Sequence, residues 1–414
     1  MLATPVTAAR AATRILYYSH DSYGLGHLRR TLSLAHHVRA KLPDATQLLV
    51  SGAAHTEGWS LPAGADWLKL PTVVKAGSGD YRPRSLECSI GSTVDLRSDI
   101  VLAASRRFKP DFFVVDHVPD GLNGEALPAL RQAASNGARL LLGLRDVLDG
   151  APYVRKAWQK AGVHGLLDDL YDRIVVYGDA SVYDVASEYG FSSAASAKTR
   201  FIGYLRAPSP APAELVRQRY GVGAKRLVVV TAGGGGDGFP LMAATLDSFL
   251  AELPAETQVI AVCGPLMPDE EQQELERRAA AGAPGIRLVT SVPDLADLMA
   301  AADAVVGMAG YNTAREILTY RRPALLVPRV HPRVEQLIRA EALGGRGLVR
   351  VLHPAELTPE RLGAEVRRLL AAGPPPPPDF SLSGLDGFVA QLRELGAAAA
   401  DVRSPLAREA TARA

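Results

Sequence analysis

The feature that most constrains this chain is a series of short apolar runs that alternate with longer segments of helical spacing. The runs are apolar at successive positions rather than at every second position, which is typical of parallel strands covered on both faces. Alternation of strand and helix predicts a doubly wound α/β architecture. The candidate strands are 14–18, 47–51, 111–115, 139–144, 173–177, 226–231, 258–262, 286–290, 303–306 and 323–327.

A change in composition divides these strands into two sets. The segment "RAPSPAPAE" at 206–214 is rich in Pro, Ala and Ser and lacks the apolar bulk of a folded element. A chain of 414 residues has room for two domains of ordinary size. We therefore expect two Rossmann-like domains facing a cleft, an N-terminal one over 14–206 and a C-terminal one over 214–372, joined by a linker at 207–213.

The composition beyond these domains predicts how the chain ends. The tract "GPPPPPD" at 373–379 cannot continue a helix or a sheet, because proline lacks the backbone N–H and fixes φ. Residues 380–397 can form one more helix, which would cross between the domains. We expect a disordered lead over 1–13 and a flexible tail over 398–414.

Charge and cysteine content exclude several classes of protein. Lys and Arg number 46 against 44 Asp and Glu, so the chain lacks the basic surplus of a nucleic-acid-binding protein. Cys88 and Cys263 lie far apart, which indicates free thiols in a reducing compartment. No signal peptide or membrane-spanning run is present. These features predict a cytoplasmic protein and leave peripheral contact with the inner membrane face open.

Two glycine-rich turns follow candidate strands. "YGLGHLRR" at 23–30 opens a helix and matches a dinucleotide fingerprint only in part, because the third glycine is missing. "TAGGGGDGFP" at 231–240 offers several backbone N–H groups and a helix start to one anion, such as a phosphate. The alternatives are a tight turn without a ligand for the first and a flexible loop for the second.

Two further segments carry polar groups that suit a ligand with hydroxyls. Thr313 and Glu316 lie about one helical turn apart, so both can face one ligand. The alternative is a capping box with Thr313 as the cap and Glu316 at the third position. After the strand at 323–327, His331, Glu335 and Gln336 can donate or accept in pairs, unless they form a solvated helix start.

At the ends of the N-terminal strands, four more polar residues are candidates for lining the cleft: Asp116, His117, Arg145 and Asp146. For Arg145 and Asp146 a local ion pair is a strong alternative, because adjacent opposite charges often pair with each other.

With these motifs in place, the sequence resembles the GT-B glycosyltransferases of family 28, a group that includes the peptidoglycan N-acetylglucosaminyltransferase that forms lipid II. It looks closest to a bacterial branch of predicted glycosyltransferases. The resemblance covers about residues 14–372 and is carried by "GLGHLRR", "RDVLDG", "GYLR", "TAGGGG" and "GYNTAREILTYRRPALLVP…EQ".

The resemblance implies that the C-terminal domain binds a nucleotide-diphosphate sugar, with UDP as the expected nucleotide, and that the N-terminal domain binds the acceptor. His27 matches a histidine taken as the catalytic base or an acceptor-site residue, and Gly24 and Gly26 belong to its turn. The donor-side positions that match are Arg206, Gly233, Gly234, Gly235, Gly310 and Thr313 near the diphosphate, Val292 at the base, Glu316 at the ribose, and Glu335 and Gln336 at the sugar.

The resemblance also implies an inverting reaction without a metal or other cofactor, the nucleotide sugar being a co-substrate. The acceptor stays open among a lipid-linked intermediate, a polysaccharide precursor and a small natural product. The family's serine in the C-terminal glycine loop is replaced by glycine, and the sugar-facing pair is Glu-Gln rather than Asp-Gln or Gln-Gln. Both departures leave the donor sugar open.

Two other functions fit the same expected fold. One is a non-hydrolysing UDP-sugar 2-epimerase, although the additional carboxylates of such an enzyme are not identifiable in the sequence. The other is a protein that binds a sugar nucleotide without turning it over. An NAD-dependent oxidoreductase ranks below both, because neither glycine turn completes the fingerprint.

Overall fold

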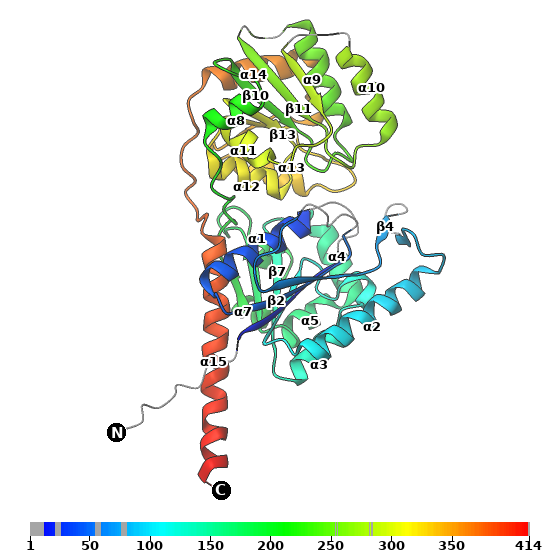
Figure 1. Cartoon of the computed structure of the whole chain (residues 1–414), viewed down its shortest axis with the longest axis vertical. Helices are drawn as coiled ribbons and strands as arrows, with labels where there is room; N and C mark the ends of the chain where they lie inside the picture. The colour runs from blue at the N-terminus through cyan, green and yellow to red at the C-terminus, as the bar shows by residue number, and fades with distance from the viewer. Residues whose placement is uncertain are drawn as a thin grey trace.

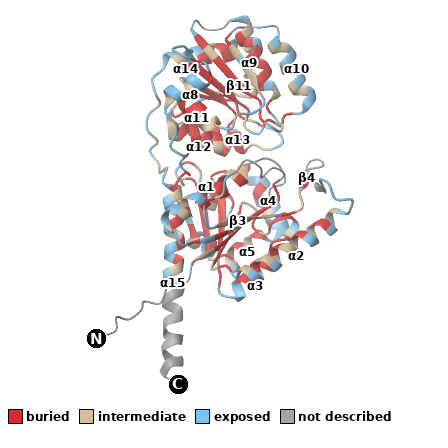
Figure 2. Cartoon of the chain, viewed as in Figure 1, coloured by how far each residue is buried: buried red, intermediate tan, exposed pale blue. Residues whose placement is uncertain are grey.

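The structure, a computed structural model, describes residues 12–20, 26–53, 59–75, 81–252, 254, 256–280, 282 and 285–412. Two α/β domains follow each other along the long axis of the molecule (Figure 1). Each contains one parallel sheet with helices against it, and Figure 2 shows that the sheets are the most deeply buried layers. The predicted fold class is therefore confirmed. Of the lead expected over 1–13, residues 1–11 lie outside the described residues.

The N-terminal domain is built on a seven-stranded parallel sheet in the order β3-β2-β1-β6-β7-β8-β9. The strands are β1 Arg14–Ser19, β2 Thr46–Ser51, β3 Ala65–Lys69, β6 Phe112–Asp116, β7 Arg139–Arg145, β8 Arg173–Tyr177 and β9 Thr199–Phe201. The helices are α1 Gly26–Lys41, α2 Ile90–Phe108, α3 Leu127–Ser135, α4 Ala151–Ala161, α5 Val163–Asp169, α6 Val185–Glu188 and α7 Ser193–Lys198. Every residue of β6 and β8 is buried, because helices cover both faces of the sheet.

The C-terminal domain repeats this plan with a six-stranded parallel sheet in the order β12-β11-β10-β13-β14-β15. The strands are β10 Arg226–Thr231, β11 Thr257–Val262, β12 Ile286–Val289, β13 Ala304–Gly307, β14 Ala324–Leu326 and β15 Arg350–Val351. The helices are α8 Ala213–Arg219, α9 Phe239–Ala251, α10 Asp269–Ala280, α11 Leu295–Ala301, α12 Tyr311–Tyr320, α13 Glu335–Gly344 and α14 Pro359–Ala371.

Five strands lie outside the predicted set. The strands β3, β9 and β15 form sheet edges, and β4 Val73–Lys75 pairs with β5 Tyr81–Pro83 in a separate antiparallel ribbon. Edge strands have one neighbour and are partly exposed, so they do not need the continuous apolar runs that mark a central strand. Cys88 and Cys263 are both free, as the sequence predicts.

The chain passes between the domains twice. The first passage lies between β9 and α8 and includes the expected linker, and the second follows α14 and includes the proline tract. An antiparallel bridge between Leu205 and Ser383 joins the two passages. A hydrophobic cluster runs through the contact between the domains, where the rings of Tyr204 and Tyr311 stack with their centroids 6.0 Å apart.

The C-terminal helix α15, Gly384–Ala412, returns to the N-terminal domain and packs on α1 (Figure 1). His37 Nε2 on α1 lies 2.9 Å from Asp386 Oδ1 on α15. The helix continues to Ala412 and so includes residues 398–412 of the segment that was expected to be a flexible tail. Ala, Arg, Leu and Glu dominate the segment, and all four have high helix propensity. No helix among the described residues is long and apolar enough to span a membrane.

Candidate active site

The connection order of the strands identifies one switch point in each sheet. The chain reverses its direction of winding between β1 and β6 in the first sheet and between β10 and β13 in the second. Ligands of open α/β sheets bind outside the carboxyl ends of the strands at such a switch point. Most of the predicted site residues lie on the loops and helix starts that follow these four strands.

At the N-terminal switch point, His27 and Asp116 form a hydrogen-bonded pair. His27 lies in the first turn of α1, and Asp116 is the last residue of β6. Nδ1 of His27 lies 2.6 Å from Oδ2 of Asp116. We assign the proton to Nδ1, because an ionised carboxylate can only accept. This tautomer leaves Nε2 as the basic nitrogen of the ring.

Arg30 fixes the same carboxylate from the next turn of α1. Its Nε donates to Asp116 Oδ1 at 2.9 Å and its Nη2 to Oδ2 at 2.6 Å. Burial by itself would raise the pKa of Asp116, but the charge of Arg30 and the hydrogen bond from His27 outweigh it and hold the pKa well below its usual range. Asp116 is therefore a permanent anion beneath His27 at neutral pH.

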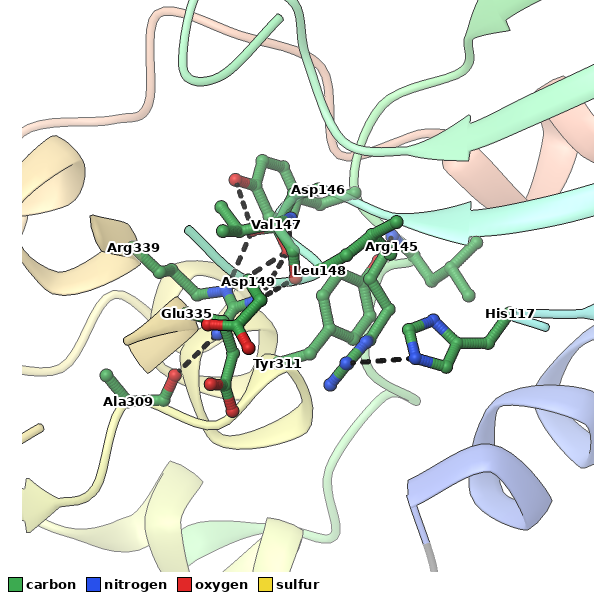
Figure 3. Close-up of polar contacts among 12 residues, drawn as sticks. His117, Arg145, Asp146, Val147, Leu148, Asp149, Ala309, Tyr311, Glu335 and Arg339 are labelled. Carbon is green, nitrogen blue, oxygen red and sulfur yellow. Dashed lines mark hydrogen bonds and ion pairs between the residues drawn. The ribbon is translucent and has the colours of Figure 1, made fainter. Parts of the chain in front are cut away.

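His117 and Arg145 extend this cluster. His117 has a left-handed backbone, with φ at 74°, which a residue other than glycine rarely adopts. Its ring centroid lies 5.1 Å from that of His27, and its Nε2 lies 3.5 Å from Arg145 Nη2 (Figure 3). Burial, followed by the charge of Arg145, lowers the pKa of His117 well below its usual range, so the ring is neutral at pH 7.

In the C-terminal domain, α12 begins directly behind the turn that follows β13. Gly310 is its N-cap and no side chain caps the helix, so the N–H groups of the first turn are open to an anion. The capping-box alternative is therefore wrong, because Thr313 lies inside the helix rather than at the cap. Thr313 and Glu316 are both buried, with Glu316 only 1% exposed.

The glycine loop after β10 lies against this turn, since a Cβ atom at Gly233 would be 3.9 Å from Thr313 Oγ1. The Gly233 N–H donates to Thr231 Oγ1 at 3.1 Å, and the Gly235 N–H donates to the Ala232 carbonyl at 3.2 Å. Gly235 also has a φ of 98°, and a Cβ there would come within 2.6 Å of the Cys263 carbonyl oxygen. Local packing therefore already requires glycine at 235.

The two switch points touch through Arg29 and Glu316. Nη2 of Arg29, on α1, donates to Oε1 of Glu316, on α12, at 2.7 Å. Asn312 Nδ2 donates to the Gly26 carbonyl at 3.4 Å, which adds a second contact between the same helices. The carboxylate expected to read a ribose is thus held by an arginine from the opposite domain.

A second ion pair joins the domains in full burial. Asp146, just past β7, receives Arg339 of α13 through Nε at 2.8 Å and Nη2 at 2.6 Å (Figure 3). Tyr204 donates to the same carboxylate at 2.9 Å, and Arg339 Nη1 donates to the Ala309 carbonyl at 2.8 Å. The alternative of a local pair between Arg145 and Asp146 is wrong, because Asp146 turns to Arg339 instead.

Glu335 and Gln336 begin α13 and are 5% and 9% exposed, so they do not form a solvated helix start. Glu335 Oε1 pairs with Arg329, whereas its Oε2 is buried without a hydrogen-bond partner. Gln336 Oε1 accepts from the Arg329 backbone N–H at 3.1 Å. Glu335 Oε2 is therefore open to a further hydrogen-bond donor.

The remaining predicted residues lie at the rim of the site or outside the description. Arg206 is exposed on the first passage between the domains, and its side chain has no hydrogen bond or ion pair among the described residues. Val292 is half-buried behind β12 and packs against the hydrophobic cluster. Gly24 lies outside the described residues.

Sequence reasoning missed the cations that organise the site: Arg29, Arg30, Arg329 and Arg339. Two signals could have found half of them. Arg30 follows His27 by three positions, and Arg339 follows Glu335 by four, so each pair shares one helix face. The pairing of Arg29 with Glu316 spans 287 positions and has no local signal.

Two observations concern possible binding sites outside the two switch points. Among the described residues, no group of His, Cys, Asp or Glu could hold a metal ion. A cavity of about 610 Å³ lies in the C-terminal domain at the start of β14 and β15, lined in part by Pro323, Gly347 and Arg350. Glu316 and the glycine loop lie beyond the opposite ends of the strands of that sheet, the carboxyl ends.

Comparison with known proteins gives a family for the second domain. Residues 227–376 match the family model described as "Glycosyltransferase family 28 C-terminal domain". Two relatives are each named UDP-N-acetylglucosamine--N-acetylmuramyl-(pentapeptide) pyrophosphoryl-undecaprenol N-acetylglucosamine transferase. The one from Corynebacterium efficiens is 30% identical over 159 residues, which are 38% of this chain and 41% of the relative. The one from Geobacillus kaustophilus is 33% identical over 144 residues, 34% of this chain and 38% of the relative. The chain thus spans about two fifths of the length of these relatives.

Solved structures support the two-domain fold over nearly the whole chain. The glycotransferase of kitacinnamycin has a TM-score of 0.56 at 21% identity and covers 95% of this chain and 99% of its own. Acinetobacter baumannii MurG has a TM-score of 0.52 at 15% identity, with 86% and 91% covered. A putative UDP-N-acetylglucosamine 2-epimerase from Listeria monocytogenes has a TM-score of 0.57 at 13% identity, with 87% and 89% covered. The chain therefore has the two-domain GT-B fold, and most of its C-terminal domain matches the C-terminal domain of glycosyltransferase family 28.

Proposed function

We propose that this protein is an inverting, metal-independent glycosyltransferase that moves a sugar from a UDP-sugar to an acceptor hydroxyl. The observation that carries the proposal is the hydrogen bond between His27 and Asp116 at one switch point, set directly against Glu316 at the other. In this proposal His27 is the general base, and the contact between Arg29 and Glu316 brings its helix against a carboxylate of the C-terminal domain. The names of the relatives include a UDP-linked sugar, which supports UDP as the nucleotide.

In the proposed reaction, Nε2 of His27 removes the proton of the acceptor hydroxyl as its oxygen attacks C1 of the donor sugar. The new bond forms between that oxygen and C1, the bond from C1 to the phosphate oxygen breaks, and UDP leaves. Asp116 accepts the Nδ1–H throughout and stabilises the imidazolium that forms. Arg30 keeps the carboxylate in place on both oxygens.

The leaving diphosphate needs its developing charge stabilised. The open N-terminus of α12, the Gly234 N–H and the start of α9 supply partial positive charge without a metal. Arg206 is free to approach from the passage between the domains. The roles of Gly233 and Gly235 are then to shape the loop rather than to donate, since both N–H groups already have partners.

The donor's other parts meet the two carboxylates of the C-terminal domain. Glu316 would accept from the ribose hydroxyls after exchanging Arg29 for them. Glu335, with one unpartnered oxygen, and Gln336 would receive the sugar hydroxyls. Val292 lies where its backbone can contact the base. We place the acceptor between the domains beside His27, His117 and Gly26.

The relatives' names also include a lipid-linked acceptor, pyrophosphoryl-undecaprenol. We include this class, with a polysaccharide precursor and a small natural product, among the acceptors to be screened. A lipid-linked acceptor would require a cytoplasmic protein bound peripherally at the inner membrane face.

The test measures UDP release from a panel of UDP-sugars with and without acceptors, in buffer containing EDTA. His27→Ala should lower turnover by about 10²–10⁴-fold while the melting temperature and UDP affinity stay near wild type. His36→Ala is the matched control, because His36 is an exposed histidine of the same helix that bonds the Ser60 carbonyl. Equal turnover of His27→Ala and wild type would refute the catalytic role.

The same panel separates the alternatives. Isomerisation of the donor without an acceptor would indicate the epimerase, a reaction for which the Listeria neighbour supplies likeness of fold alone. Tight binding of UDP-sugars with no reaction under any condition would indicate a binding protein.

A further inference from the structure

Four ion pairs balance most of the charges of the site. Among the described residues, Arg145, Arg206 and Arg315 stand outside these pairs. Asp116 holds Arg30, Asp146 holds Arg339, Glu316 holds Arg29, and Glu335 holds Arg329. Among the residues that the structure describes, Arg145 has no ion pair. Within the described part of the chain, the polar contact of its side chain is the 3.5 Å approach to His117.

Arg145 is also poorly compensated by its wider surroundings. Its Nε is buried without a hydrogen-bond partner, although a guanidinium can donate five hydrogen bonds. Burial, followed by the charges of Arg30 and Arg339, lowers its pKa to about 10. Arg145 as a whole is half-buried. A desolvated cation without a counter-ion is costly, because desolvation is not repaid by an opposite charge.

Three polar atoms in and around Arg145 lack a hydrogen-bond partner among the described residues. They are the buried atoms Arg145 Nε, His117 Nδ1 and Glu335 Oε2. Arg145 and His117 come from the acceptor-side domain and Glu335 from the donor-side domain (Figure 3). The strained backbone of His117 fits the same site, since such strain is concentrated where function requires it.

From this cluster we infer that Arg145 binds an anionic oxygen group of a substrate, a phosphate or a carboxylate, beside His117 and His27. The inference rests on the proposed function for the identity of the substrate, but not for the binding of the anion. A guanidinium presents paired donors that match either group. Two sources fit this chemistry: the diphosphate of the donor, or an acidic group of the acceptor close to its reactive hydroxyl.

The experiment compares wild type, Arg145→Gln, Arg145→Lys and the control Arg107→Gln, which removes the same charge from an exposed position on α2. Isothermal titration gives the affinities for uridine, UMP and UDP. If the donor diphosphate is the source, Arg145→Gln weakens UDP by about tenfold or more relative to uridine, and Arg145→Lys restores part of the loss. Arg107→Gln leaves all three affinities unchanged.

A second arm detects an anion from the acceptor. Inorganic phosphate is titrated against the four proteins, each both free of nucleotide and saturated with UDP, and the shift in melting temperature is recorded. If the acceptor is the source, phosphate stabilises UDP-saturated wild type and Arg107→Gln but not Arg145→Gln, whereas UDP affinity does not change. Identical responses of Arg145→Gln and wild type in both arms would overturn the inference.

The two proposals fail in different ways. Absence of UDP binding in wild type would count against the proposed function, and the phosphate arm without nucleotide would still decide the role of Arg145.

Discussion

The ion pair between Arg29 and Glu316 gives the sharpest prediction. Glu316 is 1% exposed and Arg29 is 27% exposed, so the pair is shielded from solvent on the side of the carboxylate. A ribose that binds Glu316 must first displace Arg29. We therefore predict that Arg29→Gln tightens nucleotide binding, because the competing partner is gone.

The magnitude follows from the geometry. A hydrogen bond to a charged group contributes about 1.5–3 kcal/mol, and 2.7 Å is a favourable length for one. Taking about 1.5 kcal/mol, the lower end of this range, because Arg29 is partly solvated, gives a dissociation constant about tenfold lower. Uridine, UMP and UDP all carry the ribose, so the three affinities should improve by the same factor.

Calorimetric titration of the three ligands against wild type, Arg29→Gln and Arg107→Gln measures this effect. Glu316→Gln provides the complementary variant, which should weaken all three ligands. A weaker affinity for UDP alone in Arg29→Gln would refute the reasoning, because it would make Arg29 a phosphate ligand rather than a competitor for Glu316.

Three further predictions concern residues around this contact. Asp116→Asn should lower turnover by about 10²–10⁴-fold with UDP affinity unchanged, since the wrong tautomer of His27 is then favoured; equal turnover would refute the assignment. Asp146→Asn should lower the free energy of unfolding by about 3–5 kcal/mol, because Arg339 is left buried without a counter-ion, and a denaturant titration with no change in midpoint would contradict this. The neutral His117 gains a proton more readily when the protein is unfolded. The free energy of unfolding should therefore fall as the pH drops below about 6.5, by at most about 1.4 kcal/mol per pH unit from this group. His117→Asn keeps a residue suited to positive φ and should show a shallower pH dependence in thermal melts.

The central strands of both sheets could be predicted because a strand covered on both faces is apolar at nearly every position. Val228, Val229 and Val230 in β10 are all fully buried, and the sequence shows them as one run. The edge strand β12 was predicted, but the edge strands β3, β9 and β15 could not be found in this way, since β15, for example, needs only two residues and one neighbour. The extension of α15 depends on intrinsic helix propensity, which the alanine-rich composition should have indicated.

The candidate site was predictable only where a motif follows a strand. His27, Glu316 and the glycine loop lie directly behind central strands, so the switch-point rule brings them to the cleft. The partners of Arg29, Arg30 and Arg339 were not predictable, because each comes from a distant part of the chain. Asp146 illustrates this: its neighbour in sequence is Arg145, yet it pairs with Arg339, 193 positions away.

The return of α15 to α1 has a consequence for biosynthesis. Phe388 and Leu392 of α15 are almost fully buried, and a Cβ at Gly396 would lie 3.5 Å from the ring of Phe112 in β6. Part of the core of the first domain is therefore encoded after the second domain. While the ribosome is still translating the second domain, the nascent first domain has an uncovered apolar face that α15 closes later. A premature stop codon before Gly384 would thus damage the first domain, although the sequence lost lies entirely after the second.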